Sequence, residues 1–183
     1  MAAKKFPVAT FIRRQEDLDY ITEPDIFHEV FGHIPLLTNP YYANFVSDFA
    51  KIALSHPKED WYMFLRLFWF TIEFGLIETT EGLRIYGGGI LSLYSETKTA
   101  LTTDAAIRAY FEPVSVFRTP YRIDVLQAIY YVIKDFSVMY DLTKLDYNAI
   151  LKRVRELGMW QALHPPKNQE PQDPRYAEQS NDK

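Results

Sequence analysis

The 183-residue chain contains no cysteine. Disulfide bonds, thiolate metal sites and cysteine nucleophiles are therefore excluded from its structure and chemistry. The chain also has no excess of positive charge, because its 20 lysines and arginines are outnumbered by 24 aspartates and glutamates. A nucleic-acid-binding domain usually carries a basic patch, so the formal net charge of -4 predicts no nucleic-acid partner.

Long uncharged apolar runs are missing as well. The most apolar segment, WYMFLRLFWFTIEFGLI at 61–77, contains Arg66 and Glu73 and is therefore a poor membrane span. The first 14 residues include a short apolar stretch but no small-residue cleavage site, which is unlike a secretory signal. We expect a soluble, cytoplasmic protein with no membrane partner.

The residues that are present suit one folded domain. The chain is 48% hydrophobic and 16% aromatic, which is ample material for a core. Its length corresponds to about one domain, which we expect to occupy residues 1–165. The remaining segment, 166–183, is polar and contains several prolines, so it is predicted to be a disordered tail.

Apolar spacing and capping residues predict a mainly α fold with a small amount of β. The expected helices are 24–32, 39–56, 59–77, 102–111 and 145–158, and a further helix begins after the glycine run at 87–89. The segment 83–86 is expected to form a short strand. The segment 125–136 is ambiguous between strand and helix, and its β-branched and aromatic residues favour a strand.

The segment PDIFHEVFGHIP at 24–35 holds two of the four histidines of the chain, His28 and His33, five positions apart. It resembles the zinc-binding H-E-x-x-H helix with one residue too many. Because an α-helix turns about 100° per residue, residues five apart are offset by about 140°. We expect Gly32 and Pro35 to end the helix, so that the second histidine turns back toward the first. A metal site and two ordinary histidines both stay open from this motif alone.

A third ligand candidate is Glu73, which lies in the apolar stretch LFWFTIEFGLI. A carboxylate is costly in such surroundings unless it is paired or bound to a metal. Arg66 is two helical turns away, about 10 Å along the axis, so a direct ion pair between the two is not expected. Two imidazoles and one carboxylate form the ligand set that leaves open positions on non-haem Fe(II). Glu29 is positioned to bind water or a cofactor rather than the metal.

Three stretches, TEPDIFHEVFGHIPLL, RLFWFTIEFGL and RIYGGGILSLYSE, resemble the core motifs of the pterin-dependent aromatic amino acid hydroxylases in order and spacing. The resemblance extends from about residue 6 to residue 96 and more loosely to about 140, and is greatest to bacterial members. It implies a catalytic domain of that family's fold, with the metal site in a cleft between helices. It also implies a monooxygenase that converts L-phenylalanine to L-tyrosine with O2, Fe(II) and a tetrahydropterin.

The resemblance also implies roles for individual residues. His28, His33 and Glu73 match the iron ligands. Glu29 matches a carboxylate that acts through water and the pterin, which makes it both the catalytic and a cofactor-binding candidate. Arg13 matches the arginine that holds the substrate carboxylate, a task suited to a two-pronged cation. Without the resemblance, Arg13 would be interpreted as a solvated surface residue.

Further matches surround the substrate. Trp69 matches a tryptophan beside the substrate ring, Gly89 matches backbone that approaches the substrate, and Ser92 matches a hydroxyl near its head group. Phe68, where animal members carry a tyrosine, is assigned to the cofactor site. Ile21 stands where those members carry a threonine. By pattern alone, the tryptophan would be core and the glycine part of a turn.

The sequence also departs from the family pattern, and other hypotheses stay open. The family's catalytic domains continue upstream of the position matching Met1, so the chain is expected to lack part of the pterin pocket, and without the family's oligomerisation helix it is expected to be a monomer. A catalytically incomplete fragment or binding module of the same fold is therefore a second hypothesis. A zinc hydrolase with Glu29 as general base is a third. Phenylalanine, tyrosine and tryptophan all stay open as substrates.

Overall fold

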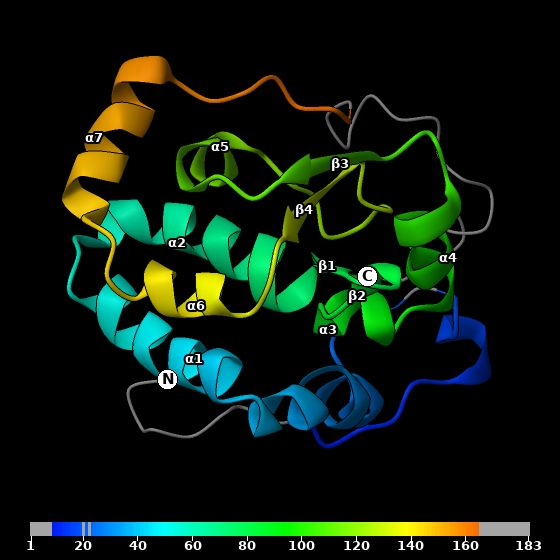
Figure 1. Cartoon of the computed structure of the whole chain (residues 1–183). Coiled ribbons are helices and arrows are strands. Elements are labelled where there is room, and N and C mark those ends of the chain that lie inside the picture. The colour runs from blue at the N-terminus through cyan, green and yellow to red at the C-terminus, as the bar shows by residue number, and fades with distance from the viewer. Residues whose placement is uncertain (1–8, 20, 22, 165–183) are drawn as a thin grey trace, which may run out of the picture.

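The computed structural model describes residues 9–19, 21 and 23–164. In this part of the chain, helices surround a four-stranded sheet with the order β2-β1-β4-β3 (Figure 1). The strands are β1 (Gly75–Thr79), β2 (Gly82–Ile85), β3 (Ile107–Tyr110) and β4 (Ile129–Ile133). Strand β1 pairs antiparallel with β2, whereas β4 lies parallel to both β1 and β3. The expected mainly α fold with a little β is confirmed.

The helices are of three kinds. The α-helices are α1 (Pro40–Leu54), α2 (Trp61–Phe68), α3 (Gly88–Leu91), α4 (Tyr94–Thr102), α5 (Pro113–Arg118), α6 (Ser137–Leu142) and α7 (Tyr147–Leu157). Three short 3-10 helices are η1 (Gln15–Asp17), η3 (Ile34–Thr38) and η4 (Lys58–Asp60). Two π-helices, η2 (His28–His33) and η5 (Trp69–Glu73), carry site residues. Among the described residues, no helix is both long enough and apolar enough to cross a membrane.

Local capping explains why the expected helices at 39–56 and 145–158 form. The Asn39 side chain accepts hydrogen bonds from the backbone N–H groups of the first turn of α1, and Pro40 occupies the first helical position. The Asp146 side chain accepts from Ala149 N at 3.0 Å and caps α7. Helix α7 ends at Gly158, whose φ of 71° suits glycine. Both predictions, and the strand predicted within 125–136, are confirmed.

One expected helix extends too far and another is wrong, because pairing with β4 overrides local propensity. The helix expected over 59–77 forms as α2 and η5 but ends at Glu73, and Gly75–Thr79 forms β1 between β2 and β4. Within the segment 102–111, expected to be helical, Ile107–Tyr110 forms the edge strand β3. There the Arg108 guanidinium donates to carbonyl groups at the end of α4, including Ala100 O at 2.7 Å and Thr103 O at 3.0 Å.

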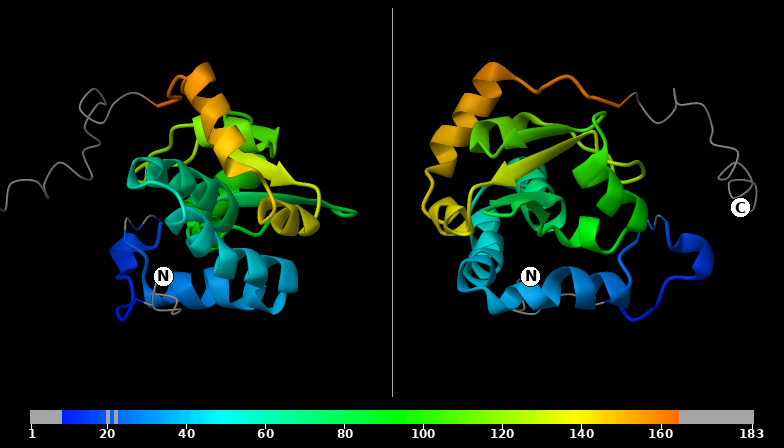
Figure 2. Two further views of the ribbon diagram at one scale, coloured as in Figure 1. Left: turned by 90° about the vertical axis from the view of Figure 1, so that its left-hand side faces the viewer. Right: turned by 45° about the vertical axis from the view of Figure 1, so that its right-hand side comes forward.

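The sheet is buried on both faces, because alternate residues of a strand point to opposite sides. Tyr131 and Ile133 join a large core with α1, α2, α5, α6 and α7, whereas Tyr130 and Val132 join a smaller core with α3 and α4. Figures 1 and 2 place the segment that carries η2 at the opposite end of the molecule from α7. The single-domain boundary at residue 165 stays a prediction, and the expected tail at 166–183 lies outside the described residues.

Candidate metal centre

The first two ligand candidates lie on a π-helix. In η2, the backbone N–H of Ile34 donates to Glu29 O, five residues earlier. A π-turn contains one residue more than an α-turn, so residues five apart come close to the same face. His28 and His33 therefore align because the helix widens. The expectation that the helix ends at Gly32 is wrong, since η2 includes Gly32 and continues through His33 into η3.

The third candidate lies at the end of a second π-helix. Helix α2 widens at Trp69 into η5, and Phe74 N donates to Trp69 O at 2.8 Å. Glu73 is the last residue of this turn, and only Phe74 separates it from β1. Isolated π-turns within helices occur frequently at functional sites. Here both segments that supply ligand candidates contain one.

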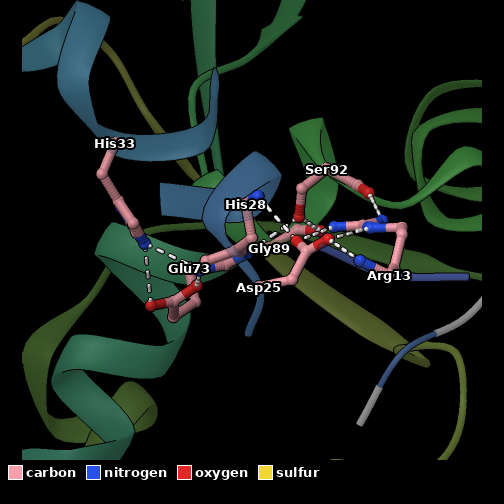
Figure 3. Close-up of polar contacts among 7 residues, drawn as sticks. All are labelled: Arg13, Asp25, His28, His33, Glu73, Gly89 and Ser92. Atoms are coloured by element: carbon pink, nitrogen blue, oxygen red, sulfur yellow. Dashed lines mark hydrogen bonds and ion pairs between the residues drawn. The ribbon is translucent and has the colours of Figure 1, made fainter. Parts of the chain in front are cut away.

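The three side chains point toward one another (Figure 3). His28 Nε2 lies 2.9 Å from His33 Nε2, and the two oxygens of Glu73 lie 3.3 Å from His33 Nε2 and 3.5 Å from His28 Nε2. Neighbouring ligands of an octahedral ion with bonds of about 2.1 Å are about 3 Å apart, so this spacing fits one shared cation. In the described part of the chain, no other cluster of three His, Asp or Glu side chains is arranged to hold a metal.

Hydroxyl groups orient both imidazoles from behind. His28 Nδ1 lies 2.8 Å from Ser92 Oγ, and His33 Nδ1 lies 3.3 Å from Tyr42 Oη. If each Nδ1 carries the proton and donates it to the hydroxyl, each Nε2 presents its lone pair to the shared centre. Burial lowers the pKa of His28, which favours the neutral imidazole that binds metals.

The glycine run packs against these ligand-bearing segments. A Cβ on Gly88 would lie 2.5 Å from His33 Cε1, and a Cβ on Gly87 would lie 2.3 Å from the backbone oxygen of Glu73. A Cβ on Gly32 would lie 2.8 Å from Gly88 O. Gly88 and Gly89 belong to helix α3 and not to the turn expected from the sequence. Side chains at these positions would therefore push α3 away from the ligands.

Arg13 lies on the other side of His28 and is not a solvated surface residue (Figure 3). Its Nε and Nη2 donate to the two oxygens of Asp25 at 2.8 and 2.6 Å, and its Nη1 donates to Ser92 O. The second Asp25 oxygen accepts from His28 N at 2.9 Å. The Arg13 guanidinium holds the pKa of Asp25 well below its ordinary value. This buried pair links the N-terminal segment to the start of η2.

Replacing Asp25 with asparagine is expected to lower the free energy of unfolding at neutral pH by about 3–5 kcal/mol, because the buried guanidinium loses its counter-charge. The folded-state pKa of Asp25 is depressed, so its stabilisation is complete above about pH 5 and is lost as the pH falls below about 4. Urea unfolding at several pH values would test this. The difference between wild type and variant should shrink in acid, and a constant difference would contradict the ion-pair explanation.

The matched control is Asp48→Asn, which removes an exposed ion pair with Lys51. An exposed pair of this kind contributes about 1 kcal/mol or less, so this variant should unfold almost as the wild type does.

An aromatic cavity of about 220 Å³ opens beside the ligand candidates. Six of the residues singled out in the sequence line it, and Ile21 lines it too. The full lining is Ile21, Pro24, His28, Leu65, Phe68, Trp69, Glu73, Phe74, Gly89, Ser92, Leu93, Tyr121 and Ile123. The Trp69 ring stacks between Phe74 and Tyr121, with centroid distances of 4.4 and 4.5 Å.

Sequence reasoning missed the part of the wall formed by Leu93, Tyr121 and Ile123. No local signal marks the last two, because they lie between α5 and β4, far along the chain from the recognised motifs. The structure brings them to the cavity only through the fold of that connection.

Glu29 is buried in η2, and its Oε2 has no hydrogen-bond partner among the residues that the structure describes. Burial raises the pKa of Glu29. Glu29 is not among the residues that line the cavity, whereas Phe68 both lines it and packs against Phe49 at a ring-centroid distance of 5.4 Å. Glu29 therefore offers a buried polar atom that does not belong to the aromatic wall.

Comparisons with known proteins agree with this arrangement. The chain is 50% identical over 167 residues to the phenylalanine-4-hydroxylase of Pseudomonas aeruginosa, covering 91% of this chain and 63% of that protein. It is 46% identical over 171 residues to the phenylalanine-4-hydroxylase of Vibrio cholerae, covering 93% of this chain and 59% of that protein. The chain thus spans about three-fifths of the length of these relatives.

Solved structures share the fold. A phenylalanine hydroxylase from Legionella pneumophila superposes with a TM-score of 0.84 at 52% identity, over 87% of this chain and 64% of that one. One from Chromobacterium violaceum, with bound iron(III) and oxidised cofactor 7,8-dihydrobiopterin, gives a TM-score of 0.80 at 37% identity, over 89% and 59%. A model of the biopterin-dependent aromatic amino acid hydroxylases matches residues 1–158. The chain belongs to the biopterin-dependent aromatic amino acid hydroxylase family.

Proposed function

We propose that this protein hydroxylates L-phenylalanine to L-tyrosine with O2 and a tetrahydropterin at a mononuclear iron(II). The observation that carries the proposal is the convergence of His28, His33 and Glu73, whose ligand atoms lie within 4.8 Å of one another beside an aromatic cavity. Relatives that are named phenylalanine-4-hydroxylase support the choice of reaction and substrate.

The donor set fits iron. Two neutral imidazoles and one carboxylate bind one face of Fe(II) and leave the other positions open. When bound, the metal would supply the site at which O2 is reduced with electrons from the pterin. The chain's own contribution is to orient the two imidazoles through Ser92 and Tyr42 and to keep water out with the aromatic wall.

The substrate is proposed to lie in the cavity with its ring against Trp69. The lining on that side is almost entirely apolar, which suits an unsubstituted phenyl ring. Such a wall alone distinguishes a ring from its hydroxylated analogue by only about 100-fold. Arg13 is proposed to bind the substrate carboxylate, with Gly89 and Ser92 near the head group. Asp25 supports this role because it fixes the plane of the guanidinium.

The pterin is proposed to bind within reach of both Glu29 and Phe68, so that the cofactor and the substrate share the cavity that Phe68 lines. The unpartnered Oε2 of Glu29 offers an acceptor for a pterin N–H group or for a bridging water. In this position Glu29 would hold or move a proton beside the metal, and its raised pKa suits that task. Phe68 is proposed as the apolar contact of the cofactor assigned from the sequence.

The two alternatives are less favoured. A zinc hydrolase would use histidines four apart on a regular helix, whereas this chain aligns histidines five apart on a π-turn and belongs to a hydroxylase family. A fragment or binding module of the same fold would bind iron but form no tyrosine. The cytoplasmic location and the monomeric state stay predictions that cell fractionation and light scattering would check.

Tyrosine formation tests the proposal directly. The purified chain would be loaded with Fe(II), mixed with tetrahydrobiopterin and L-phenylalanine in air-saturated buffer, and assayed for tyrosine by chromatography. Tyrosine should form with iron and not with the zinc-loaded protein. Stoichiometric iron binding without tyrosine formation would contradict the proposed enzymatic activity. It would favour the alternative of a catalytically incomplete fragment.

Replacing Ser92 with alanine is expected to weaken iron binding by about 10–100-fold, because His28 loses the partner that orients its ring. Iron titration of the metal-free protein would measure the change. Ser55→Ala is the matched control, since Ser55 hydrogen-bonds near the exposed end of α1. Equal iron affinities in Ser92→Ala and wild type would show that the hydroxyl does not orient the ligand.

A further inference from the structure

One buried polar network outside the metal centre contacts the aromatic wall of the cavity. The indole N–H of Trp69 donates to Gln127 Oε1 at 3.0 Å. Gln127 is only 6% exposed, and its Nε2 donates to Arg122 O at 2.9 Å and to Val125 O at 3.2 Å. The same amide therefore binds the wall and ties together the connection 119–128, between α5 and β4.

That connection supplies the part of the wall that no motif predicts. Tyr121 and Ile123 line the cavity, and the Tyr121 ring stacks on Trp69 with an interplanar angle of 19°. The Gln127 amide donates to the carbonyl of Arg122, which lies between these two residues, and to that of Val125. One side chain therefore contacts both the Trp69 ring and the backbone that carries Tyr121.

Glu96 holds the backbone of Gln127 in turn. Glu96 is fully buried in α4, and its Oε1 accepts from Gln127 N at 3.0 Å and from Tyr130 Oη at 2.6 Å. This carboxyl does not line the cavity and is not one of the ligand candidates. Burying a carboxyl group is unfavourable unless hydrogen bonds compensate for the lost hydration. We therefore expect Glu96 to have a structural role at this position.

We infer that Gln127, anchored by Glu96, is a positioning residue that fixes the Trp69–Tyr121 wall against the substrate ring. The link to the metal is short, because Trp69 and Glu73 begin and end the same π-turn. Loss of the Gln127 hydrogen bonds lets the Trp69 and Tyr121 rings rotate without displacing the three metal-ligand candidates. The catalytic part of this inference depends on the proposed function, whereas its structural part does not.

The structural part is tested by NMR of the metal-free protein. The chain has three tryptophans and hence three indole N–H signals, and the signal that disappears in Trp69→Phe is assigned to Trp69. In the wild type this hydrogen should exchange with solvent more slowly than that of the half-exposed Trp160. Exchange as fast as that of Trp160 would overturn the proposal before any variant is made.

The first variant is Gln127→Met, which keeps the volume of the side chain and removes its hydrogen bonds. The Trp69 indole signal should shift and lose its protection from exchange. The KM for phenylalanine should rise about tenfold, which is the size expected for losing the hydrogen bond that holds Trp69, while iron affinity stays within about twofold of the wild type. An unchanged indole signal, an unchanged KM or a matching loss of iron affinity would each overturn the proposal.

The control is Tyr147→Phe, which removes a buried hydrogen bond to Leu142 O at 2.7 Å, away from the cavity. It should lower the melting temperature and leave KM unchanged.

A double variant then separates positioning from general destabilisation. If Gln127 acts through Trp69, adding Gln127→Met to Trp69→Phe should raise KM by less than about twofold further. Additive effects would contradict the inference, whereas a wild type that forms no tyrosine would contradict only the proposed function.

Discussion

Replacing Glu73 with glutamine is expected to lower iron affinity more than 100-fold and to remove tyrosine formation with it. The amide keeps the shape of the side chain but loses the negative charge that lies 3.3 and 3.5 Å from the two imidazole nitrogens. Outer partners of metal ligands already contribute about 10–100-fold to affinity, so a direct ligand should contribute more. Metal analysis after gel filtration, followed by iron titration, would measure the effect.

The control is Glu81→Gln, at an exposed glutamate that pairs with Arg84 on the surface. It should bind iron as the wild type does. His28→Ala should behave like the Glu73 variant, because each removes one of three converging ligands. Full iron occupancy in either ligand variant would show that the metal lies elsewhere.

Replacing Gly88 with alanine is expected to displace the His33 imidazole or helix α3 and so to weaken iron binding. In Gly88→Ala the new Cβ would lie 2.5 Å from His33 Cε1 and 2.7 Å from its Nδ1, so either the imidazole or α3 must move. Overpacking of this kind costs about 1–3 kcal/mol of stability. We expect iron affinity to fall at least about tenfold, since the outer partners of a ligand have effects of this size. Thermal unfolding and iron titration on the same sample would separate the two losses.

Gly158→Ala provides a glycine control with the opposite pattern. Gly158 ends α7 with a φ of 71° and a ψ of 179°, and a Cβ there would meet nothing within 4 Å. Alanine in this region is strained by about 1–3 kcal/mol, so the control should lose stability without losing iron affinity. If both variants weakened iron binding equally, the effect of Gly88 would reflect stability and not the contact with His33.

The residues of the candidate metal centre could be proposed from the sequence, whereas their geometry could not. The two histidines and the glutamate stand out because a buried carboxylate needs a partner and because the chain has only four histidines. The π-turns could not be predicted, since α-geometry is the default for a helical pattern. The resulting expectation, a helix that ends at Gly32, was wrong although it led to the same pair of residues.

The secondary structure likewise contains elements that local residues determine and elements that depend on distant pairing. Helices α1 and α7 follow from Asn39, Asp146 and Gly158, which act on their own neighbours in the chain. The start of β1 and all of β3 were expected to be helical. Both segments form strands because they pair with β4, where Gly75 lies opposite Tyr131 and Ile107 lies opposite Ile129. Such distant partners leave no signature within the segment itself.

The sequence by itself determined which groups can do the chemistry, because ligand type, charge and helix capping depend on single side chains and their near neighbours. It also determined the family, through three long motifs in order. Only the tertiary structure decided where these groups meet. The widened turns align His28, His33 and Glu73. The Arg13–Asp25 ion pair and the hydrogen bond from Trp69 to Gln127 are likewise visible only in the fold. The physical reason is that close packing, glycine contacts and buried hydrogen bonds join residues far apart in the chain, and no local pattern records them.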